Sequence, residues 1–373
     1  MPCGRPDDGR ARPGAERFRP GPVHLHHLHH LHHHKRGERK VRIAVTGSIT
    51  TDHLMTFPGR LAERLVPEGL HTASLFFLVD RLTVRYGGAG ANIAYGVARF
   101  GLAPVLVGAA GPDFGEYQVW LKQHGVDVDS VLVVPDERTA RSLRTVDADG
   151  NEIASFHAGA RDAARTISLR SVAERTGALG LVLVSSDDTR AMLRHTEECR
   201  AEGVPFAADP RRRIAELGRA DAQFLVEGAE VLFGSEDDAA LLHDVTGWSA
   251  LGVLERVGAR ITTLGPAGAL VERAGREPVV VPAVPGVVAT GPSGAGDALR
   301  AGVVAGLAHG AGLVDAARLG CALASLALEA AGPQEYAVDR RRLYRRLLTA
   351  YGRQAAGALI PVLATAVGPE DRP

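Results

Sequence analysis

Cysteine, lysine and long apolar runs are scarce in this chain of 373 residues. Its three cysteines, Cys3, Cys199 and Cys321, are far apart in the sequence, so neither a disulfide framework nor a metal-spaced set is expected. With 43 basic and 43 acidic residues the net charge is zero, which gives no sign of a nucleic-acid or membrane-surface partner. No apolar run approaches the ~20 residues that span a bilayer. We therefore expect a cytoplasmic globular protein that binds neither nucleic acid nor membrane.

The first forty residues differ in composition from the rest. Residues 1–40 mix arginine, proline and glycine with a histidine-rich tract from His24 to His34, without apolar periodicity. This composition is typical of a disordered tail, so we expect a folded domain over 41–360 and a second flexible tail over 361–373. Two alternatives remain open for the N-terminal segment. Its imidazoles could chelate Zn²⁺ or Ni²⁺, or translation could begin near Val41.

Short apolar runs alternate with helical patterns through most of the domain. The patterns predict strands at 42–47, 181–185, 231–233 and 260–264, and three closing helices near 295–309, 313–331 and 339–351. Repeated strand–helix units indicate a mostly parallel sheet that is covered on both faces.

Three β-rich segments, at about 49–58, 72–87 and 139–158, do not follow this alternation. The last contains an Asp149-Gly150 pair, which is a strong hairpin turn signal. We expect these segments to form a small β-sheet inserted as a lid. The edge of such a sheet can accept a partner strand, so a homodimer through the lid is our hypothesis for the assembly.

The strongest chemical signal is the segment ATGPSGAGDALRAG at 289–302. A glycine-rich loop that leads into a helix exposes backbone N–H groups, which favour an anion. Gly294, Ala295 and Gly296 are followed at once by a carboxylate, Asp297. Phosphoryl transfer to an alcohol needs both parts, donors for the phosphoryl oxygens and a base for the hydroxyl. The alternative is that Asp297 only caps a helix.

This segment resembles the C-terminal signature of the PfkB or ribokinase-like carbohydrate kinases. The N-terminal signature of that family, two glycines with an asparagine four residues later, matches Gly87-Gly88 and Asn92, and the resemblance covers about 41–351. Within the family the chain is most similar to the actinobacterial adenosine kinases. The matching stretches are VTGSITTDHLMTFPGR (45–60), HTEECR (195–200), FAADP (206–210), TGWS (246–249), TTLGP (262–266) and QEY (334–336).

The resemblance implies a ribokinase-like three-layer α/β/α sandwich with a β-sheet lid, which uses ATP and Mg²⁺ to phosphorylate a nucleoside or sugar. It implies that Asp297 is the base and that the preceding residues form the anion hole. Arg213 stands where many members have an arginine that faces the phosphates. The other implied residues are Asp52, Gly87, Gly88, Asn92 and Phe156 for the acceptor, Ser235, Thr263, Gly265 and Gly268 for the nucleotide, and Asp238 for Mg²⁺ through water.

Three positions depart from the family pattern. Ser235 and Asp238 replace the Asn and Glu of the metal-linked motif, Gly291 replaces an aspartate, and Ser142 replaces one of two aromatic residues that sandwich adenine. The resemblance makes adenosine the leading acceptor, and the missing aromatic wall at Ser142 leaves another nucleoside, ribose or fructose as alternatives. A weakened family member that only binds a nucleoside remains possible. A nicotinamide-dependent oxidoreductase is disfavoured, because no glycine fingerprint follows the first strand.

Overall fold

The computed structural model describes residues 42–64, 76–290 and 294–368. The expected N-terminal tail and Gly291 lie outside the described residues, as does the beginning of the expected lid segment at 72–87.

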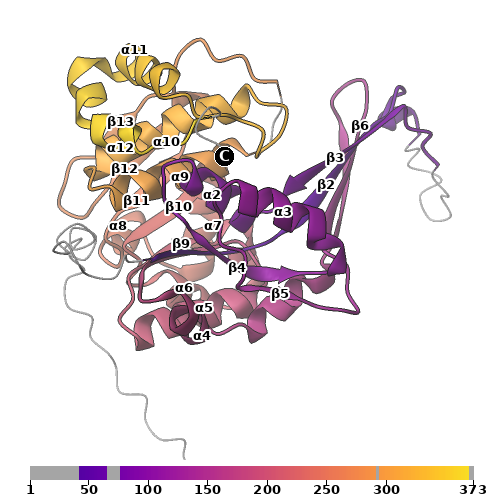
Figure 1. Cartoon of the computed structure of the whole chain (residues 1–373), viewed down its shortest axis with the longest axis horizontal. Coiled ribbons are helices and arrows are strands. Elements are labelled where there is room, and N and C mark those ends of the chain that lie inside the picture. The colour runs from indigo at the N-terminus through magenta and orange to yellow at the C-terminus, as the bar shows by residue number, and fades with distance from the viewer. Residues whose placement is uncertain (1–41, 65–75, 291–293, 369–373) are drawn as a thin grey trace, which may run out of the picture.

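A nine-stranded sheet forms the centre of the molecule (Figure 1). From one edge to the other, its strands are β13 (Val279–Val281), β12 (Ala269–Glu272), β11 (Arg260–Thr263), β10 (Val231–Ser235), β9 (Phe206–Asp209), β8 (Leu179–Ser185), β1 (Arg42–Thr46), β4 (Val105–Ala110) and β5 (Val131–Val133). All neighbouring pairs are parallel except those that involve β12 and β13, which turn back as antiparallel edge strands. The predicted mostly parallel sheet is confirmed.

Helices cover both faces of this sheet, because alternate side chains of its strands point in opposite directions. In β8, Leu181 and Leu183 join one apolar core, whereas Val182 and Val184 join the other. The helices against the first core are α2 (Ala89–Ala98), α3 (Gly115–Gln123), α9 (Ala295–Ala308), α10 (Leu313–Leu328), α11 (Arg340–Ala358) and α12 (Ile360–Ala364). Those against the second are α4 (Leu169–Thr176), α5 (Thr189–Ala201), α6 (Arg219–Val226), α7 (Glu236–Thr246) and α8 (Ala250–Leu254). The molecule is a three-layer α/β/α sandwich, as the sequence predicts.

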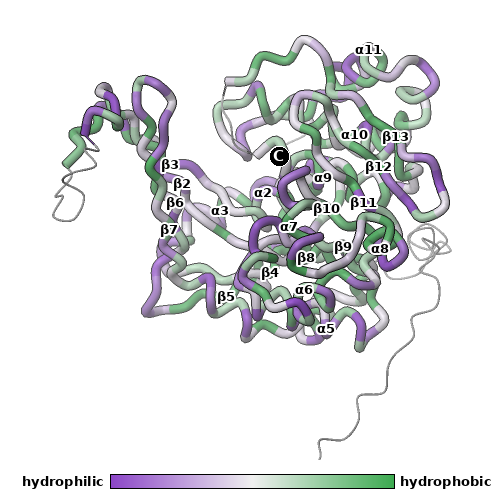
Figure 2. The backbone as a smooth tube through the Cα atoms, turned by 180° about the vertical axis from the view of Figure 1, so that it is seen from behind, coloured by the Kyte–Doolittle hydropathy of each residue, from purple (hydrophilic) through white to green (hydrophobic). Residues whose placement is uncertain are grey.

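A second, four-stranded sheet stands out from the body of the molecule (Figures 1 and 2). Its strands are β3 (Arg81–Gly87), β2 (Thr50–Thr56), β6 (Ala140–Val146) and β7 (Glu152–His157), in that spatial order. Strand β2 is antiparallel to β3 but parallel to β6, and β6 is antiparallel to β7. These strands lie within the segments predicted for the lid, and we call this sheet the lid.

The C-terminal end of the described chain packs against the body. Helix α12 begins at Ile360, and Val362, Leu363 and Ala366 are buried in the first core. The boundary expected at residue 360 therefore falls at the start of a packed helix, and residues 361–366 belong to the folded domain. The apolar periodicity over this short stretch is too weak to distinguish it from a tail.

Candidate active site

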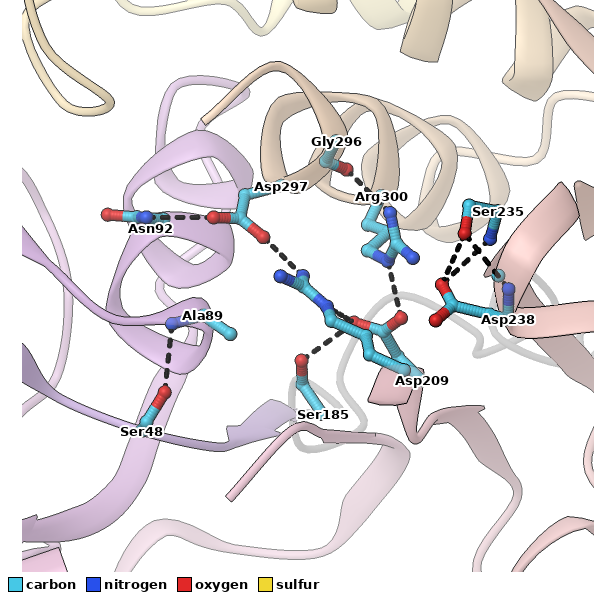
Figure 3. A network of polar contacts seen from close by, with 12 residues as sticks. Ser48, Ala89, Asn92, Ser185, Asp209, Ser235, Asp238, Gly296, Asp297 and Arg300 are labelled. Atoms are coloured by element: carbon cyan, nitrogen blue, oxygen red, sulfur yellow. Dashed lines mark hydrogen bonds and ion pairs between the residues drawn. The ribbon is translucent and has the colours of Figure 1, made fainter. Parts of the chain in front are cut away.

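Asp297 lies in the first turn of α9, close to the carboxyl end of β9, where Arg211 bridges it to Asp209. Its side chain is buried and takes part in a chain of polar contacts (Figure 3). One carboxylate oxygen, Oδ2, accepts a hydrogen bond of 2.8 Å from the side-chain amide of Asn92 on α2. The other, Oδ1, is ion-paired with Arg211. The structure thus brings together Asn92 and Asp297, which are more than two hundred residues apart in the chain.

The N-terminus of α9 has the form that binds an anion. Gly294 is its N-cap residue and has a φ of 96°, a left-handed conformation that glycine adopts without strain. In the described part of the chain, no side chain caps this helix, so the N–H groups of Ala295 and Gly296 remain free to donate. The helix dipole adds positive potential at the same place. Gly294, Ala295 and Gly296 lie where an anion hole next to Asp297 requires them.

Gly87 and Gly88 connect lid strand β3 to α2. Gly88 has a φ of 97°, and a side chain there would overlap the backbone of Ser48. Ser48 in turn accepts a hydrogen bond of 3.1 Å from the N–H of Ala89 through its hydroxyl (Figure 3). The backbone must pass this close to place Asn92 opposite Asp297, and therefore only glycine fits at position 88.

The lid presents a row of side chains on one of its faces. Asp52 of β2 is paired with Arg85 of β3 on one side and with Ser142 of β6 on the other, and Ser142 is paired with Phe156 of β7. Directly paired residues of a sheet point to the same face. Burial raises the pKa of Asp52 above its usual range, and the negative charge of Asp297 adds to this shift. The row lies on the face of the lid that turns toward the body of the molecule, because Arg85 is ion-paired with Glu335 at 3.5 Å and the guanidinium of Arg213 is 5.9 Å from the Phe156 ring.

Two guanidinium groups, those of Arg161 and Arg213, lie near the ring of Phe156, and the guanidinium carbon of Arg213 is 5.9 Å from the ring centre. The guanidinium carbon of Arg161 is 5.4 Å from the centre of the Phe156 ring, within the range of a cation–π contact. Phe156 itself is 48% exposed, so part of its ring is accessible to a ligand.

A cavity of about 580 Å³ opens beside the N-terminus of α9. Its walls are mostly apolar and include Val284, Val287 and Leu328, which suits the flat apolar faces of a nucleotide base. The predicted residues that line it are Thr263, Gly265, Gly268, Ala295 and Gly296. Ser235 is the direct neighbour of Thr263 across strands β10 and β11. The 283–289 loop and α10 complete the cavity, and no motif in the sequence singled them out.

Ser235 and Asp238 form a capping box at the start of α7 (Figure 3). The carboxylate oxygen Oδ2 of Asp238 accepts hydrogen bonds from the N–H and hydroxyl of Ser235, at 2.9 and 2.8 Å. The Ser235 hydroxyl accepts from the N–H of Asp238 at 3.1 Å. Over the described ranges, no three His, Cys, Asp or Glu side chains are grouped to hold a metal ion. A metal here would need phosphate and water ligands as well.

Sequence reasoning missed the charged groups that surround Asp297. Arg211 is ion-paired with this carboxylate, whereas Arg213, the residue that the resemblance places opposite the phosphates, is ion-paired with Glu216 at 2.5 Å. Arg211 also pairs with the fully buried Asp209 at 3.0 Å, and Arg300 of α9 pairs with the same carboxylate at 2.6 Å. Three consecutive arginines are typical of a solvated surface, so the sequence offered no means of choosing among them.

Gln334 is a second residue of the site that no chemical motif in the sequence identifies. Its side-chain amide donates to Asn92 Oδ1 at 2.9 Å and to the hydroxyl of Tyr117, and its oxygen accepts from Trp120 Nε1 at 3.1 Å. The next residue, Glu335, is ion-paired with Arg85 of the lid at 3.5 Å. This segment therefore connects the lid, α3 and the amide that holds Asp297.

Comparison with known proteins agrees with this arrangement. Residues 50–340 match the family model of the pfkB family carbohydrate kinases. The chain belongs to this kinase family. The oxidoreductase alternative is therefore wrong, and the predicted family, fold and enzyme class are confirmed.

The kinase is similar to nucleoside kinases from two lineages. It superimposes on a structure of Burkholderia thailandensis nucleoside kinase in complex with inosine with a TM-score of 0.74 and 32% identity, over 83% of this chain and 98% of that one. It is 28% identical to a nucleoside kinase of Methanothermobacter thermautotrophicus over 281 residues, 74% of this chain and 88% of that protein. A ribokinase of Cryptococcus neoformans in complex with ADP gives a TM-score of 0.64 at 25% identity, over 79% and 96% of the two chains.

Among the helices of the described residues, none has the length and apolarity that crossing a bilayer requires.

Proposed function

We propose that this kinase transfers the γ-phosphoryl group of ATP to the 5′-hydroxyl of a nucleoside, with adenosine, converted to AMP, as the leading acceptor. The observation that carries the proposal is the position of Asp297. It lies at an uncapped helix N-terminus, with an apolar nucleotide-sized cavity on one side and the polar row of the lid on the other. The B. thailandensis nucleoside kinase, which has been solved with ADP and inosine, is 33% identical to this chain and supports both ligands.

In the reaction we propose, Asp297 removes the proton of the acceptor hydroxyl as its oxygen bonds to the γ-phosphorus. The bond between that phosphorus and the β–γ bridging oxygen breaks, and ADP leaves. The N–H groups of Ala295 and Gly296 donate to the phosphoryl oxygens, whose negative charge is greatest in the transition state. The dipole of α9 favours the same charge.

The donor nucleotide would occupy the cavity lined by Thr263, Gly265 and Gly268. Mg²⁺ bound with ATP would supply charge compensation for the phosphates. Mg²⁺ keeps several waters and is commonly held by one or two carboxylates together with substrate phosphates. Asp238 fits this role through water, because only its Oδ2 is engaged in the capping box. The residues Ser235 and Asp238 are then compatible with a metal-dependent kinase.

The acceptor would lie between the lid row and Asp297. Asp52 and Asn92 can bind vicinal ribose hydroxyls, and the exposed ring of Phe156 can stack on the base. Arg161 lies close enough to that ring to border the base where Ser142 provides no aromatic wall. A pocket of this kind accepts more than one base, so inosine and guanosine are candidate acceptors together with adenosine. A sugar kinase would not need the ring of Phe156.

The experiment is an ADP-release assay with Mg-ATP against adenosine, inosine, guanosine, ribose and fructose. The proposal predicts that a nucleoside has the highest kcat/KM and that its 5′-monophosphate is the product by mass spectrometry. Turnover with ribose or fructose alone would make this a sugar kinase. Binding of a nucleoside without any turnover would identify the weakened family member, with Ser235 and Asp238 as the first suspects.

We also propose that the lid forms a homodimer. The face opposite the Asp52 row carries Leu82, Val84 and Met55, and the first two are 58% and 53% exposed. A second copy of the same face would cover these apolar side chains. Sedimentation velocity at micromolar concentration should give a dimer, and Val84→Arg should convert it to a monomer. A monomeric wild-type protein would end this proposal.

A further inference from the structure

Arg211 adopts a backbone conformation that L-residues rarely take. It begins the short 3₁₀ helix Arg211–Glu216, directly after strand β9, with a φ of 50°. Across the part of the chain that the structure describes, it is the single non-glycine residue with a positive φ. Such strain persists where the surroundings enforce it, and it is concentrated at functional sites. Here it directs the guanidinium between two carboxylates, those of Asp209 and Asp297.

The fully buried Asp209 has other partners besides Arg211. Its carboxylate is ion-paired with Arg300 at 2.6 Å and accepts a hydrogen bond of 2.8 Å from the Ser185 hydroxyl (Figure 3). Neutralising Asp209 therefore does not require a second guanidinium. The contact that Arg211 alone provides is the one to Asp297.

The ion pair with Arg211 engages the carboxylate of Asp297, which is the proposed base. Arg211 holds Oδ1 of Asp297, and Asn92 holds Oδ2, so both oxygens of the carboxylate are engaged by the protein. In this arrangement a water molecule in the acceptor site would meet a base whose two oxygens are both already engaged by the protein.

We propose that Arg211 is a positioning residue that withholds Asp297 from water until an acceptor displaces the guanidinium, and so suppresses acceptor-independent hydrolysis of ATP. This inference rests on the proposed kinase function. A nucleoside can displace Arg211 because its ribose and base are bound elsewhere, by Asp52 and Phe156, and this remote binding energy offsets the loss of the ion pair. Water has no such additional contacts, and therefore leaves the ion pair intact.

The test is the rate of ADP release from Mg-ATP without any acceptor, compared between the wild-type protein and Arg211→Asn. Asparagine tolerates the left-handed backbone and removes the guanidinium. The matched control is Arg212→Asn, which removes the neighbouring, exposed arginine. We expect hydrolysis to rise about tenfold or more in Arg211→Asn, which corresponds to about 1.4 kcal/mol of barrier, and to stay unchanged in Arg212→Asn.

A second substitution identifies the base as the source of the effect. Arg211→Asn combined with Asp297→Asn should return hydrolysis to the wild-type rate or below it. A purely structural role for Arg211 would lower nucleotide turnover and could not produce a gain that depends on Asp297. If Arg211→Asn fails to fold, Arg211→Lys serves instead, because a lysine cannot bridge both carboxylates. We expect it to raise hydrolysis about threefold or more.

Unchanged or slower hydrolysis in a folded Arg211→Asn protein that still binds ATP would overturn the inference. A large fall in kcat with acceptor and no rise without it would show that Arg211 stabilises the transferred phosphoryl group instead. Either result leaves the proposed function intact if the wild-type protein phosphorylates a nucleoside. Failure of the wild-type protein to phosphorylate any nucleoside would remove the proposed function itself.

Discussion

Replacing Gln334 by leucine should impair both stability and acceptor use, although this residue touches neither reacting group. Its side chain is 2% exposed and holds Asn92, Tyr117 and Trp120 through one amide. Leucine has a similar volume but can neither donate nor accept a hydrogen bond. Tyr117 keeps its hydrogen bond of 2.9 Å to the carbonyl of Gly87. Asn92 Oδ1 and Trp120 Nε1 lose the partner that Gln334 provides.

The magnitude follows from these two groups. An unsatisfied buried polar atom costs about 1–3 kcal/mol, so the loss of two partners should lower the free energy of unfolding by about 2–6 kcal/mol. The function should change as well, because Asn92 would then be held only through its bond to Asp297. We expect kcat/KM for the acceptor to fall about tenfold, which corresponds to about 1.4 kcal/mol, while the KM for ATP changes little.

Urea denaturation and steady-state kinetics measure the two effects. The control is Glu335→Gln at the next position, which removes a partly exposed ion pair to Arg85 that contributes about 0–1 kcal/mol. If Gln334→Leu unfolds within about 0.5 kcal/mol of the wild-type protein and keeps kcat/KM within about twofold, the network does not position Asn92 and the reasoning is refuted.

Two further substitutions test the acceptor site and a buried charge. Phe156→Ala should raise the KM for nucleosides by about 5- to 150-fold, because stacking on a base contributes about 1–3 kcal/mol. A similar rise in the KM for ribose would show that the ring does not contact the base. Burial raises the pKa of Asp187 from 3.8 to about 7. Between these two pH values the folded protein keeps a proton on this carboxyl that the unfolded chain has released, so the free energy of unfolding falls as the pH rises through this range. Asp187→Asn removes this titration, so its stability relative to wild type should increase from about pH 4 to about pH 7, by at most ~4 kcal/mol in urea denaturation. A stability difference that is constant with pH would show that Asp187 is ionised in the folded protein.

The sequence predicts the layers of this fold because strand–helix alternation is local and repeats. Each buried run of the central sheet, such as β8 or β10, carries its own apolar signal between turn residues. The lid is identified because its segments lack this strand–helix alternation. The end of the domain is less accessible to sequence reasoning, since α12 has only five residues and packs into a core that it shares with α2, which is distant in the chain.

The site is predictable where backbone geometry restricts the residue type. Gly88 and Gly294 are required by a left-handed backbone and close neighbours, so they belong to motifs that can be found in a single sequence. Side-chain partners across the site are not constrained in this way. Arg211 reaches Asp297 only because of its unusual φ, and Gln334 reaches Asn92 from more than two hundred residues away. Contacts of this kind depend on the tertiary structure and leave no local pattern.

The measurement that tests the central claim most directly is the rate of nucleoside phosphorylation by Asp297→Asn, with ATP and nucleoside binding measured by calorimetry on the same preparation. Asparagine keeps the size of the side chain and its contact with Asn92 but cannot take a proton. If Asp297 is the base, kcat should fall by about 10²–10⁴-fold while both ligands still bind. If the variant binds both ligands and retains kcat within about threefold of the wild-type protein, Asp297 does not act as the base and the proposed mechanism is wrong.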